Sequence, residues 1–350
     1  MQTASPLEQF AGKVIDDIGA AASGALVILG DRLGIYQSLA RSGAVTSATL
    51  ANLTQLNERY LREWLSAQAA SGYVEFDPAT DEFSMTPEQI AVFADPDHPA
   101  AMVGGYYGIS SMYHDEPLIE EAFRTGQGVP WGDHNNCLFC GTERFFRTGY
   151  SAYLVNSWLP SLDGVTGKLN AGARVADVGC GHGASTILMA QAFPNSQFIG
   201  FDLHEGSITT ARLHAKEQGV TNCRFEVATA KNFPGTGYDL VTVFDALHDM
   251  GDPVGAAAHI RQSLAPDGTW MIVEPMAGDS LAENLNPIGR IYYSFSTMIC
   301  TPGSRSQEVG LALGAQAGEK RLHEVISEGG FTRFRRASET PVNLILEARP

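Results

Sequence analysis

Hydrophobic and polar positions follow two different periods in the second half of the chain. From Arg174 onward, short apolar runs alternate with segments whose apolar residues recur at helical spacing. The short runs predict buried strands, and the segments between them predict helices. The predicted strands are 174–179, 197–202, 223–228, 238–245, 269–274, 333–338 and 343–348. The predicted helices are 184–193, 205–218, 254–265 and 319–329.

This alternation predicts an α/β fold with a Rossmann-like, doubly wound sheet of seven strands. Such a sheet is mostly parallel and is covered by helices on both faces. The last two strands lie too close in sequence for a helical crossover, so we expect them to form a terminal antiparallel hairpin.

The first hundred residues show a different pattern, mostly helical. Apolar residues from Leu26 to Leu39 predict one helix, Thr46 and Ser47 are suited to cap a short helix ending at Leu53, and a stronger helix follows over 58–71. A strand, a turn and a strand over 73–86 complete the order expected of a winged helix. We therefore predict three segments. They are a helical winged-helix dimerisation domain at 1–100, linker and substrate-lid helices at 101–172 with a helix over 142–159, and a ligand-binding domain at 173–350.

Charge argues against a nucleic-acid partner for this winged helix. Residues 1–100 carry five basic and thirteen acidic side chains, and the whole chain has a net charge of −16. Arg59 and Arg62 lie one helical turn from Glu63 and Glu58, where each pair can form within the helix. Phosphate binding depends on Lys and Arg, so dimerisation is the preferred role and DNA binding the less favoured one.

Cysteine usage and hydropathy favour a cytoplasmic protein without a membrane partner. The five cysteines form no disulfide framework, and no apolar run reaches the roughly 18 residues of a membrane span. His134, Cys137 and Cys140 form a His-x-x-Cys-x-x-Cys pattern, but a zinc site usually has four ligands and no second Cys or His pair follows. Incidental thiols, pocket lining and a metal all remain open for this pattern, and no metal is our expectation.

The segment after the first strand of the sheet is suited to a ligand. Gly179, Gly181 and Gly183 alternate there, just after Asp177 and just before a helix. Glycines let the backbone approach a ligand closely, and the unpaired N–H groups of the helix start face the same place. Asp202 ends the next strand, where an acid accepts hydrogen bonds from ribose hydroxyls. The pattern predicts a nucleotide-like cofactor.

With these motifs, the region 174–348 resembles the class I methyltransferases that depend on S-adenosylmethionine (SAM). The Gly-x-Gly-x-Gly spacing is similar to their motif I. Three further features make the resemblance more specific: Leu-His-Asp-Met-Gly-Asp-Pro at 247–253, Val-Glu-Pro at 273–275 and the winged helix. It is closest to a bacterial winged-helix methyltransferase group that is similar to the small-molecule O-methyltransferases of plants and bacteria. The resemblance implies SAM as cofactor, a small-molecule methyl acceptor and a homodimer.

The resemblance also implies which residues act. The residues implied to bind the cofactor are Asp177, Gly179, Cys180, Gly181, Asp202, Leu203, Ala230, Lys231, Asp245 and Ala246. His248 falls on the general base of the O-methyltransferases, and its usual pKa near 6.5 suits removing a proton from a phenol. Glu274 and Glu319 match the positions that orient this base or enclose the substrate.

Several alternatives stay open on the sequence. His248 can instead be a buried structural histidine that caps its loop with Asp249. The aromatic and methionine pattern that clamps phenolic substrates is only partly present over 288–303, so C-, N- or S-methylation remain alternatives to O-methylation. A SAM-responsive winged-helix transcriptional regulator is the rival function, and the glycine spacing disfavours a Rossmann oxidoreductase. The acceptor itself does not follow from the sequence.

Overall fold

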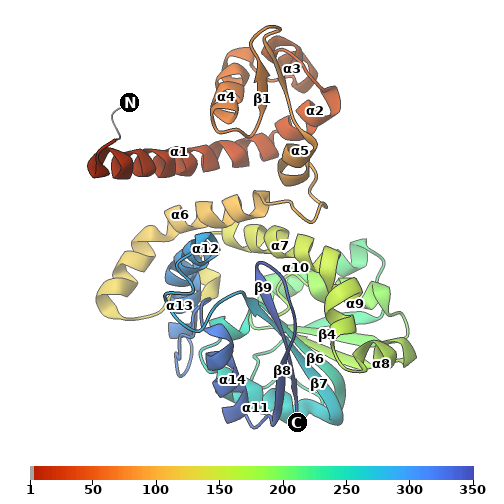
Figure 1. The fold of residues 1–350 in the computed structure, drawn as a ribbon. Coiled ribbons are helices and arrows are strands. Elements are labelled where there is room, and N and C mark those ends of the chain that lie inside the picture. Colours follow the sequence, from red (N-terminus) through yellow and green to blue (C-terminus); the bar gives the residue numbers. More distant parts are fainter. Residues whose placement is uncertain (1–3) are drawn as a thin grey trace. The chain divides into compact units, whose positions relative to one another are not determined.

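The computed structural model describes residues 4–350, which divide into two compact units (Figure 1). Unit 1 comprises the chain up to Ser111 together with Asn136–Thr148, and unit 2 comprises Met112–Asn135 and Gly149–Pro350. Each unit has its own apolar core. The three predicted segments 1–100, 101–172 and 173–350 remain a prediction about domain boundaries.

Unit 1 is mainly helical. Its elements are α1 (Pro6–Arg32), α2 (Ile35–Ser42), α3 (Ser47–Thr54), α4 (Glu58–Ala70), β1 (Glu75–Asp77), β2 (Glu82–Ser84), α5 (Pro87–Phe93), the start of α6 (Val103–Thr125) and most of α7 (Cys137–Gly149). Three helices followed by a two-stranded antiparallel wing confirm the predicted winged helix. The ion pairs predicted within α4 are also present, Arg62 with Glu58 at 3.2 Å and Arg59 with Glu63.

Two helix predictions in this part of the chain need correction. The single helix predicted over 26–39 is wrong, because the chain leaves α1 after Arg32 and restarts as α2 after Gly34, whose φ of +65° breaks the helix. The helix predicted over 142–159 begins earlier, at Cys137, and continues past Gly149 as a π-helix, Tyr150–Trp158. Helical periodicity does not distinguish a π-helix from an α-helix over so few turns.

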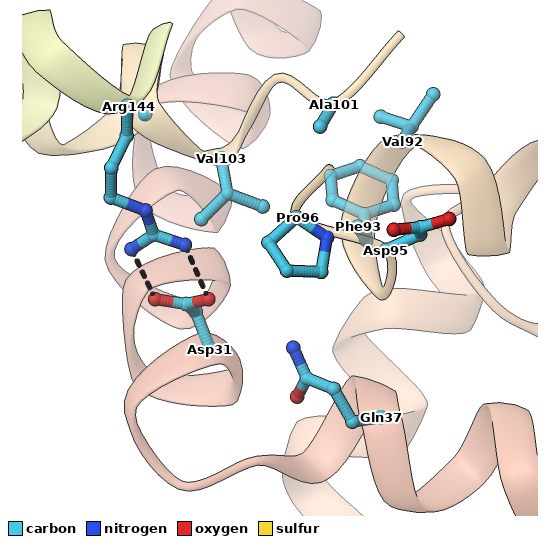
Figure 2. A pocket seen from close by; sticks show the side chains of 10 residues that line it. Asp31, Gln37, Val92, Phe93, Asp95, Pro96, Ala101, Val103 and Arg144 are labelled. Atoms are coloured by element: carbon cyan, nitrogen blue, oxygen red, sulfur yellow. Dashed lines mark hydrogen bonds and ion pairs between the residues drawn. The ribbon is translucent and has the colours of Figure 1, made fainter. Parts of the chain in front are cut away.

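A small pocket in unit 1 is lined on one side by an ion pair (Figure 2). The guanidinium of Arg144 donates to both carboxylate oxygens of Asp31, at 2.7 and 2.9 Å, and the Tyr107 hydroxyl donates to the same carboxylate at 2.8 Å. These contacts hold the pKa of Asp31 below its usual value although burial works to raise it. The pair ties α1 to α7, which is a structural role.

Unit 2 alternates strands and helices. The strands are β3 (Arg174–Val178), β4 (Gln197–Asp202), β5 (Cys223–Val227), β6 (Tyr238–Phe244), β7 (Leu264–Pro275), β8 (Arg333–Glu339) and β9 (Asn343–Arg349). The α-helices after the π-helix are α8 (Val165–Ala171), α9 (Ala184–Ala192), α10 (Glu205–Glu217), α11 (Pro253–Ser263), α12 (Pro287–Phe295), α13 (Thr301–Arg305) and α14 (Gly318–Glu328). Short 3₁₀ turns cover Trp131–Asp133, Leu159–Ser161 and Leu247–Asp249, and a second π-helix covers Ser296–Cys300.

The sheet has the predicted architecture. Its strand order is β5-β4-β3-β6-β7-β9-β8, with parallel pairing from β5 to β7 and antiparallel pairing of β9 with both β7 and β8. Helices lie on both flanks of the sheet, α8 and α9 on one and α11 and α14 on the other (Figure 1). The seven-stranded Rossmann-like sheet with its terminal hairpin is therefore confirmed.

The two edge strands carry charged side chains that pair with neighbours. On β5, Arg224 bonds Glu226 at 2.8 Å, and on β8, Arg335 and Arg336 form ion pairs with several carboxylates. The strands between the edges are buried almost throughout. Among residues 4–350, no single helix is long and apolar enough to cross a membrane, and the bent pair of α1 and α2 qualifies by length and composition alone.

Candidate functional site

The loop from β3 to α9 contains the three glycines, all at positive φ. A Cβ on Gly179 would lie 2.9 Å from the Cβ of Ala246, and one on Gly183 would lie 2.8 Å from the ring of Phe225. A Cβ on Gly181 would have no atom within 4 Å. The outer two glycines are therefore needed for packing, whereas Gly181 borders open space at the carboxyl end of the sheet, where such folds bind ligands.

Asp177 lies beneath this loop rather than at its surface. The side chain is 1% exposed, and its carboxylate accepts hydrogen bonds from the hydroxyls of Ser185 at 2.7 Å, Thr186 at 2.6 Å and Thr242 at 2.9 Å. Burial raises the pKa of Asp177 in spite of these three donors. The contacts of Asp177 thus fix the start of α9 against β6, and a cofactor contact through its carboxylate is not among them.

Asp202, at the end of β4, faces the glycine loop. Its carboxylate accepts the backbone N–H of Gly181 at 2.9 Å and that of His204 at 2.8 Å. Burial raises the pKa of Asp202, and the two backbone donors oppose that shift. Each oxygen accepts one bond from these donors and keeps a further lone pair, while the adjacent Leu203 side chain is 54% exposed. An acid and an apolar surface therefore lie next to each other beside Gly181.

The other residues that the resemblance places near the nucleotide have side chains that are already engaged. Mainly their backbone groups are left to contact a ligand. The Cys180 thiol is buried, and its side chain packs with Ile187 and Phe225. Lys231 Nζ is paired with Asp252 at 3.0 Å and Glu308 at 2.8 Å. The Ala230 methyl group packs against the main core of unit 2.

Asp245 and Ala246 follow β6 at the centre of the same sheet edge. Asp245 has φ of +48°, a strained conformation for a residue other than glycine, and such strain is enriched at functional sites. Its carboxylate accepts the Tyr150 hydroxyl at 3.1 Å and the Asn343 amide at 2.8 Å. Burial, reinforced by the nearby Glu274, raises the pKa of Asp245 to about 8.

His248 is held by Glu274 from the neighbouring strand. The pairing of Phe244 with Val273 places the ends of β6 and β7 side by side, so Glu274 can reach the turn that follows β6. Glu274 Oε2 lies 2.7 Å from His248 Nδ1, and Oε1 accepts the backbone N–H of Leu247 at 3.0 Å. Both side chains are almost fully buried. A carboxylate at this distance fixes the Nδ1–H tautomer and leaves Nε2 as the basic atom.

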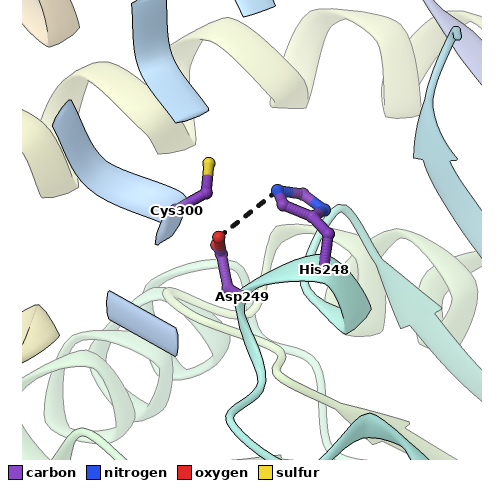
Figure 3. Close-up of side chains that lie close together, drawn as sticks. All are labelled: His248, Asp249 and Cys300. Atoms are coloured by element: carbon purple, nitrogen blue, oxygen red, sulfur yellow. Dashed lines mark ion pairs between the residues drawn. The ribbon is translucent and has the colours of Figure 1, made fainter. Parts of the chain in front are cut away.

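The second nitrogen of this imidazole faces another acid. Nε2 of His248 lies 3.3 Å from Oδ1 of Asp249, and the Cys300 thiol is close to both (Figure 3). Burial works to lower the pKa of His248, but the carboxylates of Asp249 and Glu274 together raise it well above its usual value. Burial raises the pKa of Asp249 and raises that of Cys300 to about 12.

Glu319 is not brought to this cluster. It lies in the first turn of α14, and its carboxylate accepts from Arg336 Nε on the edge strand β8 at 2.7 Å. That contact is a partly exposed ion pair, with neither His248 nor Glu274 among its partners. The structure therefore joins two of the three residues expected to be catalytic and separates the third.

The His-x-x-Cys-x-x-Cys pattern spans the boundary between the two units. His134 belongs to unit 2, where its Nδ1 lies 2.9 Å from Asp115, whereas Cys137 and Cys140 belong to α7 in unit 1. Among residues 4–350, the side chains grouped at metal-ligand distances are instead His248, Asp249 and Cys300.

Sequence reasoning missed three residues of this site, Cys300, Asn343 and Tyr150 as a ligand of Asp245, and it named Asp249 only as the partner of a structural His248. Asp249 had a signal, because it follows His248 directly in a turn after a strand. The other three reach the site through long-range packing, which no local pattern reports.

Comparison with known proteins agrees with this geometry. Residues 169–330 match the family model described as a methyltransferase domain, and residues 21–94 match an Rv2258c-like winged HTH domain. A ubiquinone biosynthesis O-methyltransferase from Leptothrix cholodnii is 33% identical over 115 residues, which are 32% of this chain and 47% of that protein. The chain thus spans about half the length of the curated relatives it matches.

Solved structures extend the likeness to the whole chain. Human N-acetylserotonin methyltransferase, solved in complex with SAM, gives a TM-score of 0.73 at 17% identity, and the match covers 99% of each chain. An O-methyltransferase family protein from Burkholderia thailandensis gives 0.70 at 16% identity, covering 100% of this chain and 99% of that one. At such identities the likeness establishes the fold.

Proposed function

Because the chain carries a methyltransferase domain and, ahead of it, a winged-helix domain, we propose that this protein transfers the methyl group of SAM to a small organic acceptor. O-methylation is the reaction that the site supports best. The observation that carries this choice is the buried His248–Glu274 pair at 2.7 Å, placed at the carboxyl end of the sheet beside the glycine loop. A base at this place has its main use in removing a proton from an acceptor hydroxyl.

The residues around Gly181 fit SAM. Open space borders Gly181, the Asp202 carboxylate keeps lone pairs for ribose hydroxyls, and the exposed Leu203 offers an apolar surface for the adenine ring. Ala230 and Lys231 would contact the adenine through their backbone, because their side chains are already engaged. Asp245 and Ala246 would face the methionine part of the cofactor.

The charge of the site also suits SAM. Asp202, Asp245 and Glu274 lie at the carboxyl ends of β4, β6 and β7 in the same sheet, and burial raises the pKa of the first two. Buried carboxylates that repel one another are stabilised by a nearby cation. SAM carries a sulfonium cation, whereas its product S-adenosylhomocysteine (SAH) does not.

In the proposed mechanism, SAM when bound supplies a methyl group on positively charged sulfur. His248 Nε2 accepts the proton of the acceptor hydroxyl as the new bond forms, and Glu274 holds the ring through Nδ1 and stabilises the imidazolium that results. Asp249, beside Nε2, favours the protonated ring. Methyl transfer is an in-line displacement, so the backbone around Gly181 and Ala246 acts by holding the two reactants in line.

Calorimetric titration with SAM, SAH and NADH tests the cofactor. We expect SAM and SAH to bind and NADH not to bind, and Asp202→Ala to lose both sulfur ligands. Asp202→Asn is the matched variant, since its amide oxygen can still accept the Gly181 N–H while the charge is gone. Loss of binding in a variant that keeps its circular dichroism and thermal transition supports the ribose role. Wild-type protein that binds neither SAM nor SAH would refute the proposal, and the SAM-responsive regulator with it.

A screen of phenols, amines and thiols with isotopically labelled SAM then tests the reaction. We expect transfer to a hydroxyl that His248→Ala reduces by 10²–10⁴-fold, the usual contribution of a general base. Glu319→Gln is the control, because Glu319 pairs with Arg336 on the edge strand. Transfer to nitrogen, carbon or sulfur that is insensitive to His248→Ala would contradict O-methylation with His248 as the base.

We further propose that α1 mediates a homodimer. Five apolar side chains of this helix are exposed at helical spacing, Leu7, Phe10, Val14, Ile15 and Ile18. A stripe of this kind fits a second copy of the same stripe. In sedimentation, we expect Phe10→Glu with Ile18→Glu to give a monomer, while Phe10→Leu with Ile18→Leu leaves a dimer. A wild-type monomer at high concentration would refute this assignment.

A further inference from the structure

The side chains His248, Asp249 and Cys300 suggest a second chemical function for the candidate site. Their ligand atoms lie within 4.8 Å of one another (Figure 3). They reach this place from the turn after β6 and from the π-helix Ser296–Cys300. One imidazole, one carboxylate and one thiol converge there, and base catalysis as proposed above uses the imidazole and the carboxylate but has no task for the thiol.

Two buried polar atoms near this cluster lack hydrogen-bond partners. Within residues 4–350, these atoms are Oδ1 of Asp249 and Nε2 of His134. Buried polar atoms are nearly always satisfied, so an unpartnered atom calls for an explanation such as an ion. The His134 side chain is fully buried, and the ring is close enough to Asp249 to stabilise its negative charge.

The imidazoles are also held in the way that metal-binding histidines are held. Nδ1 of His248 is bonded to Glu274 at 2.7 Å, and Nδ1 of His134 is bonded to Asp115 at 2.9 Å. Histidines that bind metals almost always donate their other ring N–H to a carboxylate or carbonyl, which fixes the ring and makes the free nitrogen more basic.

The spacing of the first two ligand atoms fits a tetrahedral ion. Zinc lies about 2.0–2.1 Å from imidazole nitrogen and about 2.0–2.2 Å from carboxylate oxygen, so two such ligands at a tetrahedral angle are about 3.4 Å apart. Nε2 of His248 and Oδ1 of Asp249 are 3.3 Å apart. The thiol of Cys300 completes a set that zinc prefers, whereas magnesium and calcium prefer oxygen ligands throughout.

We propose that His248 Nε2, Asp249 Oδ1 and Cys300 Sγ form a binding site for a zinc ion. As zinc binds, the thiol releases its proton to solvent and an S–Zn bond forms, and His248 Nε2 releases any proton it carries as the N–Zn bond forms, with no change of oxidation state. The charges of the thiolate and the carboxylate then balance the two positive charges of the ion. Balanced charge is what a buried site requires.

This site has a consequence for catalysis that rests on the proposed function. Zinc and a proton compete for the same lone pair on His248 Nε2. A zinc-loaded protein therefore lacks its base, and methyl transfer to hydroxyl acceptors is blocked until the ion leaves. The metal site and the cofactor site use different residues, so SAH binding is unaffected.

Cobalt(II) is the probe, because it replaces zinc in such sites and reports its ligands by absorption. We expect metal-free protein to bind one equivalent of Co²⁺. The bound ion should show a thiolate-to-cobalt charge-transfer band and the strong visible bands of a tetrahedral ion, and added Zn²⁺ should abolish both. Cys300→Ser should remove the charge-transfer band, and Glu274→Gln, which leaves all three ligands in place, should weaken zinc binding about 10–100-fold.

The controls separate this site from the other thiols. Cys137→Ser with Cys140→Ser should leave the cobalt spectrum unchanged, and so should Cys223→Ser. SAH binding in each variant shows that the fold is intact, and it stays independent of the metal result. Absence of a saturable cobalt spectrum in the wild type, or a charge-transfer band that survives Cys300→Ser, would overturn the proposal while leaving the methyltransferase assignment standing.

Discussion

The charge of Asp249 is expected to set the pKa of the base. Nε2 of His248 and Oδ1 of Asp249 are 3.3 Å apart, so a full carboxylate charge favours the imidazolium by about 1.3 kcal/mol in water-like surroundings and about 5 kcal/mol at an effective dielectric constant of about 20. These energies correspond to about one to nearly four pKa units. Asp249→Asn should therefore lower the pKa of His248 by at least about one unit.

The sign follows from the chemistry of the base. A base acts in its neutral form, which appears as pH rises through the pKa of the ring. In the wild type the two carboxylates raise the pKa of His248, so the neutral form appears only above the usual histidine range. In Asp249→Asn it should appear at lower pH, and the acidic limb of the rate profile should move with it.

Nuclear magnetic resonance of labelled histidine rings measures this pKa without a methyl acceptor. The chain has nine histidines, so the resonance of His248 is assigned from its disappearance in His248→Gln. Asp252→Asn is the control, since Asp252 lies in the same segment but pairs with Lys231. A His248 pKa that stays the same or rises in Asp249→Asn would refute the reasoning, because Asp249 could not then be the charged partner.

Three further predictions concern the cofactor loop and its surroundings. Gly183→Ala should destabilise the fold by about 1–3 kcal/mol in urea unfolding, because the new methyl meets Phe225. Gly181→Ala should destabilise the fold less, because its methyl meets no atom and only the positive φ is strained, and it should lose SAM affinity in calorimetry. The affinity of SAM relative to SAH should fall as pH drops below about 8, since Asp245 then becomes neutral, and a ratio independent of pH would contradict its place beside the sulfonium. Asp177→Ala should lower the free energy of unfolding by about 2–4 kcal/mol, because three buried hydroxyls lose their acceptor; an unchanged urea midpoint would contradict this.

Local sequence pattern was sufficient for most of the sheet. Strands β3 to β6 end within a residue of their predicted limits. Gly179 and Asp245 directly follow β3 and β6, and Asp202 ends β4, so these three apolar runs have clear ends. β7 begins at Leu264 instead of Thr269, since Ala265 to Gly268 read as a turn while their backbone continues the strand through an irregularity opposite Tyr238 and Leu240. At such positions the pairing between strands, rather than the local propensity of the residues for a turn, decides the backbone conformation.

The site residues at or just after the ends of strands could be predicted from the sequence. Those that long-range packing brings to the site could not. Asp202 ends β4 and His248 lies in the turn after β6, so the topology of a doubly wound sheet places them at one edge. Asn343 reaches Asp245, 98 residues earlier in the chain, because β9 pairs with β7. The role of Asp177 depends on which way its side chain points, and the sequence pattern carries no information about that direction.

The charged edges of the sheet affect how the protein behaves in crowded solution. An edge strand offers unpaired backbone groups to any passing strand, which is how sheets aggregate. A strand from another molecule that paired with β5 would have to desolvate the Arg224–Glu226 ion pair. One that paired with β8 would have to desolvate Arg335 and Arg336. The sheet thus resists growth from chain to chain at both ends. Replacing these charged residues with valine or threonine would remove that protection, and the exposed edge could then serve as a template for fibril formation.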